Sequence, residues 1–246
     1  MNSFLGELFG TALLITLGDG VVANVVLSKT KGHQSGWIVI CLGWAMAVYT
    51  GVFVSSPYST AHLNPAVSIG LAAAGKFDWA LVPSYILAQM LGAMMGAFFV
   101  WLAYRQHFDE TDDVSMKLAV FCTGPAIRNS LYNLLTEIIG TFILVFGVLF
   151  ILGPTLKLNG ATGDLGLGAI GALPVGLLVL GIGLSLGGPT GYAINPARDL
   201  GPRIMHFVLP IGKKGGSDWN YSWIPVIGPI LGALSAALIF KLMFPH

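Results

Sequence analysis

Charged residues are scarce in this chain, and their scarcity excludes a soluble globular fold. Only 9% of the 246 residues are charged, whereas 55% are hydrophobic and the mean hydropathy is +0.79. A soluble protein of this size carries roughly a quarter charged residues, which cover its apolar core with a polar surface. Too few charges are present here to form such a surface, so lipid is the solvent that fits the composition.

Cysteine and charge of one sign are also lacking. The two cysteines, Cys41 and Cys122, have no spacing typical of a metal or redox site, so we expect free thiols. The net charge is +1 and the charges are scattered, so we expect no nucleic-acid partner. No cluster of metal ligands is present, and Ser185 and His62 have no spacing typical of a nucleophile and its base. We therefore expect no enzyme, no metal and no cofactor.

Long apolar runs are what the sequence has instead. A helix needs about 20 mostly apolar residues to cross the hydrocarbon of a bilayer. Six windows meet this condition, at residues 4–27, 36–54, 80–104, 131–153, 168–187 and 222–244. The first window is too long for a removable signal peptide and has no basic region or cleavage site, so we expect it to stay in the mature protein. The sequence predicts an all-α membrane protein with six transmembrane helices.

The two halves of the chain repeat one another. The pattern Glu-x-x-Gly-Thr begins at Glu7 and at Glu137, and Asn-Pro-Ala begins at Asn64 and at Asn195. The glutamate and the asparagine are 57 residues apart in the first half and 58 in the second. A third echo, Leu-Gly-Ala, occurs at 91–93 and at 231–233. We predict one domain, residues 1–246, with repeats at approximately 1–105 and 131–246 joined by a loop at 106–130.

The repeats are expected to be inverted and to meet at the middle of the membrane. Each contains three predicted spans, an odd number, so the second repeat enters the bilayer from the opposite face. Asparagine is a favoured helix N-cap and proline is favoured at the first helical position, so each Asn-Pro-Ala predicts a helix start. The segments that follow, 67–74 and 198–207, are too short to span, and we expect two re-entrant half-helices.

The stretches before the two motifs indicate a pore. Residues 55–63 and 187–194 are rich in Gly, Pro, Ser and Thr. Irregular backbone at membrane depth survives only where it is packed in protein or lines a water-filled cavity, because lipid cannot satisfy its polar groups. We therefore expect a water-filled pore between the two motifs.

These features together resemble the major intrinsic proteins, the aquaporin family, over essentially the whole chain. The resemblance rests on the inverted pair of motifs, each with its preceding Glu-x-x-Gly-Thr, and on the continuation of the second motif into Arg198 and Asp199. The motif residues are Asn64, Pro65 and Ala66 in the first half and Asn195, Pro196 and Ala197 in the second. With an aspartate directly after the arginine, the chain resembles the glycerol-conducting branch of the family, the aquaglyceroporins or glycerol uptake facilitators. The resemblance implies an aquaporin-like fold with one pore per chain and four chains in a homotetramer.

The function implied by the resemblance is a passive channel for glycerol and other small neutral solutes, with water, that excludes ions and protons. Urea, dihydroxyacetone, lactic acid and hydrogen peroxide fit similar pores, and the sequence does not rank them. The alternative in the same family is a water-selective aquaporin, which Gly183 and Asp199 argue against. A coupled secondary transporter also uses inverted repeats and broken helices, but it needs a site for a coupling ion.

The resemblance also assigns the outer constriction to Trp44, Gly183, Tyr192 and Arg198. Water-selective relatives have a histidine at the position of Gly183, so glycine implies a wider opening. Trp44 and Tyr192 would contact the carbon backbone of the solute, and Arg198 would donate to its hydroxyl groups. A gapped alignment would place Ile40 there instead of Trp44. The glycerol branch often has phenylalanine at the position of Tyr192, and the added hydroxyl is expected to make the constriction narrower and more polar.

Further polar residues receive roles from the same resemblance. Asn64 and Asn195 would each present an amide donor to the lumen, beside the positive ends of the half-helices. His62 either lines the pore or is a neutral histidine bonded to the backbone of the loop. Glu7 and Glu137 are expected to be scaffold acceptors for the re-entrant loops rather than a proton relay. Asp19 receives no assignment.

The expected orientation conflicts with the distribution of positive charge. The resemblance implies a multi-pass protein of the plasma membrane, surrounded by the lipid bilayer, with both termini in the cytoplasm. The inside loops would then hold Lys76, Lys157 and Lys241. The outside would hold Lys29, Lys31, Arg105, Lys117, Arg128, Arg203, Lys213 and Lys214. The positive-inside rule favours the opposite orientation, and the family pattern is preferred here because the bias falls partly in longer loops.

Overall fold

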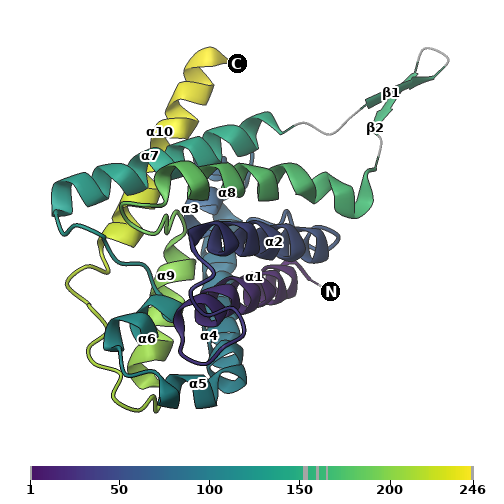
Figure 1. Cartoon of the computed structure of the whole chain (residues 1–246). Coiled ribbons are helices and arrows are strands. Elements are labelled where there is room, and N and C mark those ends of the chain that lie inside the picture. The colour runs from purple at the N-terminus through teal and green to yellow at the C-terminus, as the bar shows by residue number, and fades with distance from the viewer. Residues whose placement is uncertain (1, 152–154, 159–160, 165, 245–246) are drawn as a thin grey trace.

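In the part of the chain that the structure describes, six long apolar helices form the body of the molecule (Figure 1). The structure is a computed structural model that describes residues 2–151, 155–158, 161–164 and 166–244. The spanning helices are α1 (Ser3–Val26), α2 (Trp37–Ser55), α4 (Val82–Ala103), α7 (Ser130–Phe150), α8 (Leu173–Leu186) and α10 (Ile224–Met243). Short 3-10 turns, η1 (Trp79–Leu81) and η2 (Gly168–Ala172), extend α4 and α8. The predicted fold class is confirmed, although residues 152–153 of the fourth predicted span lie outside the described residues.

The two predicted half-helices are present, and each packs against a long helix of the other repeat. They are α3 (Pro65–Ala73) and α9 (Pro196–Val208), and each begins at the proline directly after its asparagine cap. Helix α3 of the first half packs against α10 of the second, whereas α9 of the second half packs against α4 of the first. This exchange brings the start of each half-helix to the boundary between the repeats.

Four short elements lie outside the predicted set. Helices α5 (Arg105–Glu110) and α6 (Val114–Phe121) occupy most of the predicted connecting loop, and the Asp113 carboxylate caps α6. Strands β1 (Thr155–Leu158) and β2 (Ala161–Asp164) form an antiparallel hairpin. The hairpin projects away from the helices in Figure 1. These elements are too short for their apolar spacing to show a period in the sequence.

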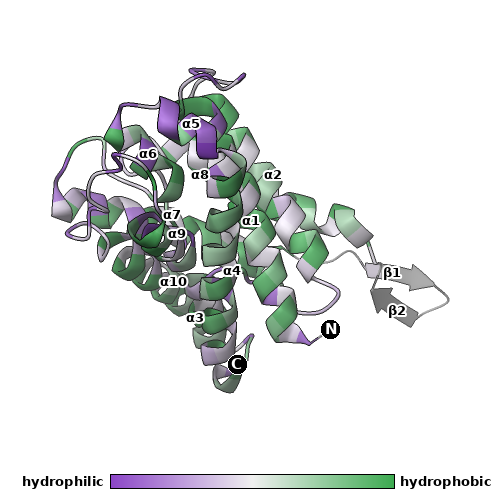
Figure 2. Cartoon of the chain, turned by 90° about the horizontal axis from the view of Figure 1, so that it is seen from below, coloured by the Kyte–Doolittle hydropathy of each residue, from purple (hydrophilic) through white to green (hydrophobic). Residues whose placement is uncertain are grey.

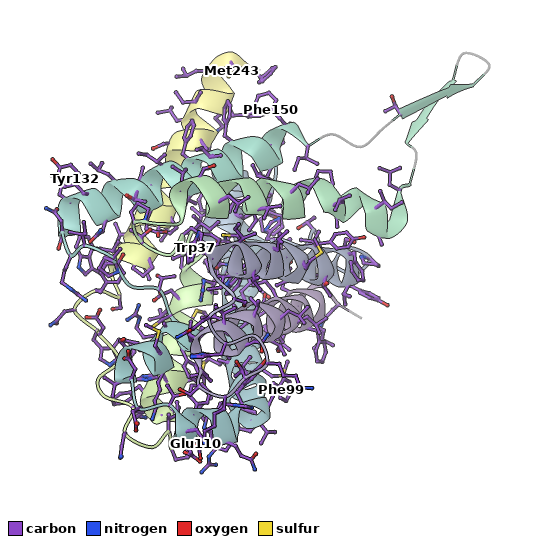
Figure 3. All side chains as sticks on the ribbon, viewed as in Figure 1. Trp37, Phe99, Glu110, Tyr132, Phe150 and Met243 are labelled. Carbon is purple, nitrogen blue, oxygen red and sulfur yellow. The ribbon has the colours of Figure 1, made fainter. Side chains whose placement is uncertain are left out.

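Apolar residues cover the outside of the long helices. Figure 2 shows hydrophilic residues gathered around α5, α6 and the neighbouring loops, whereas the long helices are mainly hydrophobic. Exposed side chains such as Phe99 and Met243 project outward (Figure 3). A surface of this kind is stable only in contact with lipid or with another apolar surface.

Two glycines at equivalent places in the repeats allow the helices to cross closely. A Cβ atom on Gly92 of α4 would lie 2.3 Å from the carbonyl oxygen of Leu8 in α1. A Cβ atom on Gly232 of α10 would lie 2.4 Å from the carbonyl oxygen of Ile138 in α7. Small residues permit such backbone contact in lipid, where the hydrophobic effect does not drive helices together. The Leu-Gly-Ala echo in the sequence therefore marks the two crossing points.

Replacement of Gly92 by alanine should disrupt the crossing of α4 and α1. The added methyl group meets backbone, which cannot move aside as a side chain can. The matched control is Gly181→Ala in α8, where nothing lies within 4 Å of the new Cβ atom. We expect Gly92→Ala to lose most of its monodisperse folded fraction in detergent, and Gly181→Ala to stay within about 1 kcal/mol of the parent protein. Equal folded fractions in size-exclusion chromatography would contradict this account of the crossing.

Candidate functional site

The carboxylate of Glu7 holds the first re-entrant loop. Its Oε1 accepts hydrogen bonds from the His62 backbone N–H at 2.9 Å and the Ser59 hydroxyl at 2.7 Å. Its Oε2 accepts from the Leu63 backbone N–H at 2.8 Å and the Gln89 amide at 2.7 Å. Glu7 is completely buried. Four donors around one carboxylate satisfy both the buried charge and the backbone of the loop.

Glu137 makes the equivalent contacts in the second half. Its Oε1 accepts from the Ala193 backbone N–H at 3.0 Å and the Thr190 hydroxyl at 2.7 Å. Its Oε2 accepts from the Ile194 backbone N–H at 2.8 Å. The two halves therefore use the same device: a glutamate of the first helix of each repeat binds two consecutive backbone N–H groups of the re-entrant loop.

The backbone held in this way has an unfavourable conformation. Ala61 and Leu63 have φ angles of 51° and 52°, and Tyr192 and Ile194 have φ angles of 39° and 43°. Residues with a Cβ atom rarely adopt this left-handed region, and a β-branched isoleucine does so least readily. Leu63 and Ile194 are also residues whose N–H groups bind the glutamates. The carboxylates thus stabilise the strained turns that lead into the two half-helices.

Each motif asparagine caps its own half-helix and binds the opposite loop. Asn64 Oδ1 accepts from the Ala66 N–H at 2.9 Å, and its Nδ2 donates to the carbonyl of Ile194 at 2.8 Å. Asn195 Oδ1 accepts from the Ala197 N–H at 3.0 Å, and its Nδ2 donates to the carbonyl of Leu63 at 2.9 Å. The caps fix which end of each amide is oxygen. Each amide therefore retains one N–H, and it can act toward a solute only as a donor.

One cavity of about 160 Å³ joins the two motifs. Asn64 and Asn195 both line it, together with Trp44, Tyr192 and Arg198. Most of the remaining wall is aliphatic and includes Leu14, Val48, Val52, Leu71, Leu144 and Val148. The N-termini of α3 and α9 begin at this wall, and each carries about half a positive elementary charge.

Arg198 and Trp44 lie together in the cavity wall, and Gly183 lies behind Tyr192. The guanidinium carbon of Arg198 is 4.0 Å from the centroid of the Trp44 ring. A Cβ atom on Gly183 would lie 2.9 Å from Cζ of Tyr192 and 3.1 Å from Sγ of Cys41. The space that a side chain at 183 would need is filled by the tyrosine ring, so glycine acts by letting Tyr192 pack against α8.

The Tyr192 hydroxyl is buried, and its polar neighbour is the thiol of Cys41. The ring edge that carries it lies against Gly183. The expectation that this hydroxyl makes the constriction more polar therefore does not fit the structure, in which the tyrosine offers its ring to the cavity.

Trp37 supports this arrangement and is absent from the predicted set. Its indole Nε1 donates to the carbonyl of Gly183 at 3.1 Å, and its ring meets the Tyr192 ring edge-on at 5.7 Å. Trp37 lies seven residues before Trp44, and this spacing places both on one face of α2. That spacing is the signal that could have found it.

Ile40 does not line the cavity of Trp44. It lies instead with Trp37 in a second, larger pocket of about 570 Å³. Of the two alignments left open by the sequence, the ungapped one, with Trp44, is the one that puts a residue into the cavity of the two motifs.

The ring of His62 contacts side-chain hydroxyl groups, not the loop backbone that the second interpretation expected. His62 lines the cavity. Its ring nitrogens also lie within hydrogen-bond distance of hydroxyl groups, Nε2 at 2.8 Å from Thr60 and Nδ1 at 3.0 Å from Ser68. Because both ring nitrogens are held, the imidazole keeps one orientation in the cavity wall.

Asp199 lies behind the cavity rather than in its wall. Its carboxylate accepts from the Thr123 N–H at 2.8 Å and hydroxyl at 2.7 Å, and from Nε of Arg203 at 2.8 Å. Arg203, which is fully buried, also donates to the carbonyls of Ser217 and Thr123. The pair ties α9 to two outer segments of the chain. Arg203 is absent from the predicted set, although its spacing of four residues from Asp199 on a helix is the usual sign of such a pair.

Replacement of Glu137 by glutamine should destabilise the second re-entrant loop. Glutamine has a similar shape, but it carries no charge and turns an N–H₂ group toward backbone N–H donors. Hydrogen bonds to a charged group contribute about 1.5–3 kcal/mol each, so we expect a loss of more than about 2 kcal/mol. The readout is the midpoint of thermal unfolding in detergent.

The matched control is Glu110→Gln, which removes an exposed ion pair with Lys29. Such surface pairs contribute about 0–1 kcal/mol, so the control should unfold near the parent temperature. A similar midpoint for the two variants would show that Glu137 does not hold the loop.

Comparisons with known proteins agree with this geometry. The family profile described as Major intrinsic protein matches residues 1–240. A probable glycerol uptake facilitator protein of Thermotoga maritima is 57% identical over 244 residues, 99% of this chain and 100% of the relative. A glycerol uptake facilitator protein of Streptococcus pneumoniae is 55% identical over 242 residues, 98% of this chain and 99% of the relative.

A solved structure gives the same result for the fold. The X-ray structure of the aquaglyceroporin from Plasmodium falciparum superposes with a TM-score of 0.83 at 33% identity, over 99% of this chain and 96% of that one. The family profile, the relatives and the fold agree over nearly the whole length. The chain therefore belongs to the major intrinsic protein family.

Proposed function

We propose that this protein is a passive channel for glycerol and other small neutral solutes, with water, and that it has no catalytic activity. The observation that carries the proposal is the single cavity on which both asparagine amides, both half-helix N-termini and Arg198 converge. The names of the relatives at 57% and 55% identity, both glycerol uptake facilitators, support glycerol as a solute.

The cavity has two kinds of wall, which suit a polyol. Asn64, Asn195 and Arg198 offer N–H donors. Trp44 and Tyr192 offer aromatic surface. Glycerol has its CH groups along one side and its hydroxyl groups along the other, so it can meet both walls at once. Each hydroxyl would exchange a hydrogen bond with water for one with the protein while the carbon backbone leaves water.

Ions and protons are excluded by the same groups. The two half-helix N-termini, and the N–H donors that Arg198 turns toward the cavity, disfavour a cation there. The asparagine amides act as donors only, so a water between them must accept from both. Such a water cannot continue a chain in which each molecule donates to the next, and proton transfer along the file is interrupted.

The exposed apolar faces of the long helices support a multi-pass location in a membrane. We propose the plasma membrane as its location and a homotetramer as its assembly, as the resemblance to the family implies. We place both termini in the cytoplasm. The conflict with the positive-inside rule is smaller than the sequence implied, because Arg203 lies buried within α9 rather than in a loop.

Stopped-flow light scattering on reconstituted vesicles tests the proposal. The panel contains glycerol, urea, dihydroxyacetone, lactic acid and hydrogen peroxide, and water is measured separately. The key variant is Gly183→His, because a side chain at 183 must push the Tyr192 ring toward the cavity. We expect glycerol flux to fall at least about tenfold and water flux by less than about threefold, while Gly181→Ala leaves both unchanged.

Other outcomes separate the competing functions. Water flux without glycerol flux in the parent protein would establish a water-selective channel. A solute flux that follows a proton or sodium gradient would establish a coupled transporter. Equal loss of water and glycerol flux in Gly183→His would show that this position does not discriminate between the two solutes.

Replacement of Tyr192 by phenylalanine should change little. The hydroxyl is buried beside Gly183 and the Cys41 thiol, so its removal leaves the aromatic wall in place. We expect the ratio of glycerol to water flux to change by less than about twofold in the same vesicles. A larger change would place the hydroxyl in the solute path.

A further inference from the structure

A buried ion pair lies directly behind the cavity. Asp19 of α1 is 3.3 Å from Nη1 of Arg198 through its Oδ1. The Asp19 side chain has no exposed surface, and that of Arg198 is 7% exposed. Arg198 lines the cavity, whereas Asp19 is not part of its wall. The aspartate thus contacts the arginine from the protein side and leaves the opposite side of the guanidinium to the solute.

The donors of Arg198 divide into two groups. Nη1 is turned inward, toward the Asp19 carboxylate and the carbonyl of Phe121 at 3.4 Å. Nε and Nη2 have no hydrogen-bond partner among the residues that the structure describes. The guanidinium also lies over the Trp44 ring. With one nitrogen held by the carboxylate and the guanidinium carbon 4.0 Å from the centroid of the Trp44 ring, the remaining donors are the ones that can meet a solute hydroxyl.

Gly18, the residue before Asp19, packs against Trp44, the aromatic partner of Arg198. A Cβ atom on Gly18 would lie 2.2 Å from Cζ3 of Trp44, so only glycine allows the indole to lie against α1 here. Consecutive residues of one helix therefore support the two partners of the stack: Gly18 receives Trp44, and Asp19 holds Arg198. This explains why a Gly-Asp sequence occurs inside an apolar span.

The charges in this region are matched in pairs. Asp199 pairs with Arg203 at 2.8 Å, and both side chains are fully buried. Arg198 then has Asp19 as its only carboxylate partner within the described residues. A buried carboxylate is costly, and Oδ2 of Asp19 has no hydrogen-bond partner in the described part of the chain. Removal of Asp19 alone would leave Arg198 as a buried charge with no carboxylate partner among the described residues, so the carboxylate acts together with the arginine.

We propose that Asp19 is a positioning and charge-balancing residue of the channel. It holds Nη1 of Arg198 so that Nε and Nη2 face the solute, and it cancels the net charge of the arginine. The constriction can then offer strong N–H donors to hydroxyl groups without attracting anions into a pore whose half-helix ends are already positive. The proposal rests on the channel function proposed above and adds a determinant of its selectivity between neutral and charged solutes.

The test is a double-mutant cycle in reconstituted vesicles, with the variants Asp19→Asn, Arg198→Leu and the double replacement. Chloride entry is followed with an entrapped chloride-quenched dye, potassium entry with a potassium-sensitive dye, and glycerol entry by light scattering. Asp19→Asn is nearly isosteric but leaves Arg198 as an uncompensated cation. We expect anion permeability to rise at least about fivefold and glycerol flux to fall by two- to fivefold.

The other variants distinguish charge balance from a purely structural role. Arg198→Leu leaves Asp19 uncompensated and should raise potassium permeability, and the double replacement should return both ion permeabilities close to the parent values. Asp19→Glu keeps the charge and should keep anion permeability low. If Asp19→Asn does not fold, the comparison of Arg198→Leu with the double replacement carries the test through the potassium signal alone.

Two results would overturn the proposal. One is an anion permeability of Asp19→Asn equal to that of the parent protein. The other is an ion leak that persists in the double replacement, because a leak of that kind reports a damaged fold rather than an unbalanced charge. Absence of glycerol flux in the parent vesicles would instead refute the channel function itself, so the two failures can be told apart.

Discussion

Re-entrant backbone inside a membrane protein must have its polar groups satisfied without water or lipid, and the rest of this structure depends on how that is done. Glu7 and Glu137 each bind two consecutive N–H groups of a loop whose residues adopt left-handed conformations. Without these acceptors the loops would expose unsatisfied donors at membrane depth, where each costs several kcal/mol. The carboxylates therefore fix the positions at which the two half-helices can begin.

Fixed half-helix starts determine the polarity of the cavity. Because Asn64 and Asn195 use their oxygens as N-caps, their N–H₂ groups must point away from their own helices, toward the opposite loop and the cavity. The carbonyls that receive them belong to Leu63 and Ile194, whose N–H groups bind the glutamates. One connected network thus determines that the centre of the cavity offers donors. The two amides alone therefore make the wall at that point a hydrogen-bond donor, without a charged side chain.

The sequence predicts this architecture well because the features involved are periodic or repeated. Spans follow from the length of apolar runs, inversion follows from an odd number of spans in each repeat, and the half-helices follow from asparagine and proline at their starts. Other features depend on contacts between residues far apart in the chain. Asp19 meets Arg198 across 179 positions, and Arg203 reaches the carbonyl of Thr123 across 80. Gly183 illustrates the same limit, since its neighbour Tyr192 fills the space that a glycine in isolation suggests is open.

The distribution of charge around the cavity follows from the same constraint. A membrane interior tolerates a charge only with a partner, and Arg198 has both the Asp19 carboxylate and the Phe121 carbonyl within reach. A carboxylate in the cavity wall would accept hydrogen bonds from the solute and oppose the donors of the two asparagines. Asp19 avoids this conflict because it contacts Arg198 from behind, where it is completely buried. Placing the anion on the protein side lets the wall keep its donors and lose its net charge, which are the two properties that a pore for neutral hydroxyl compounds requires.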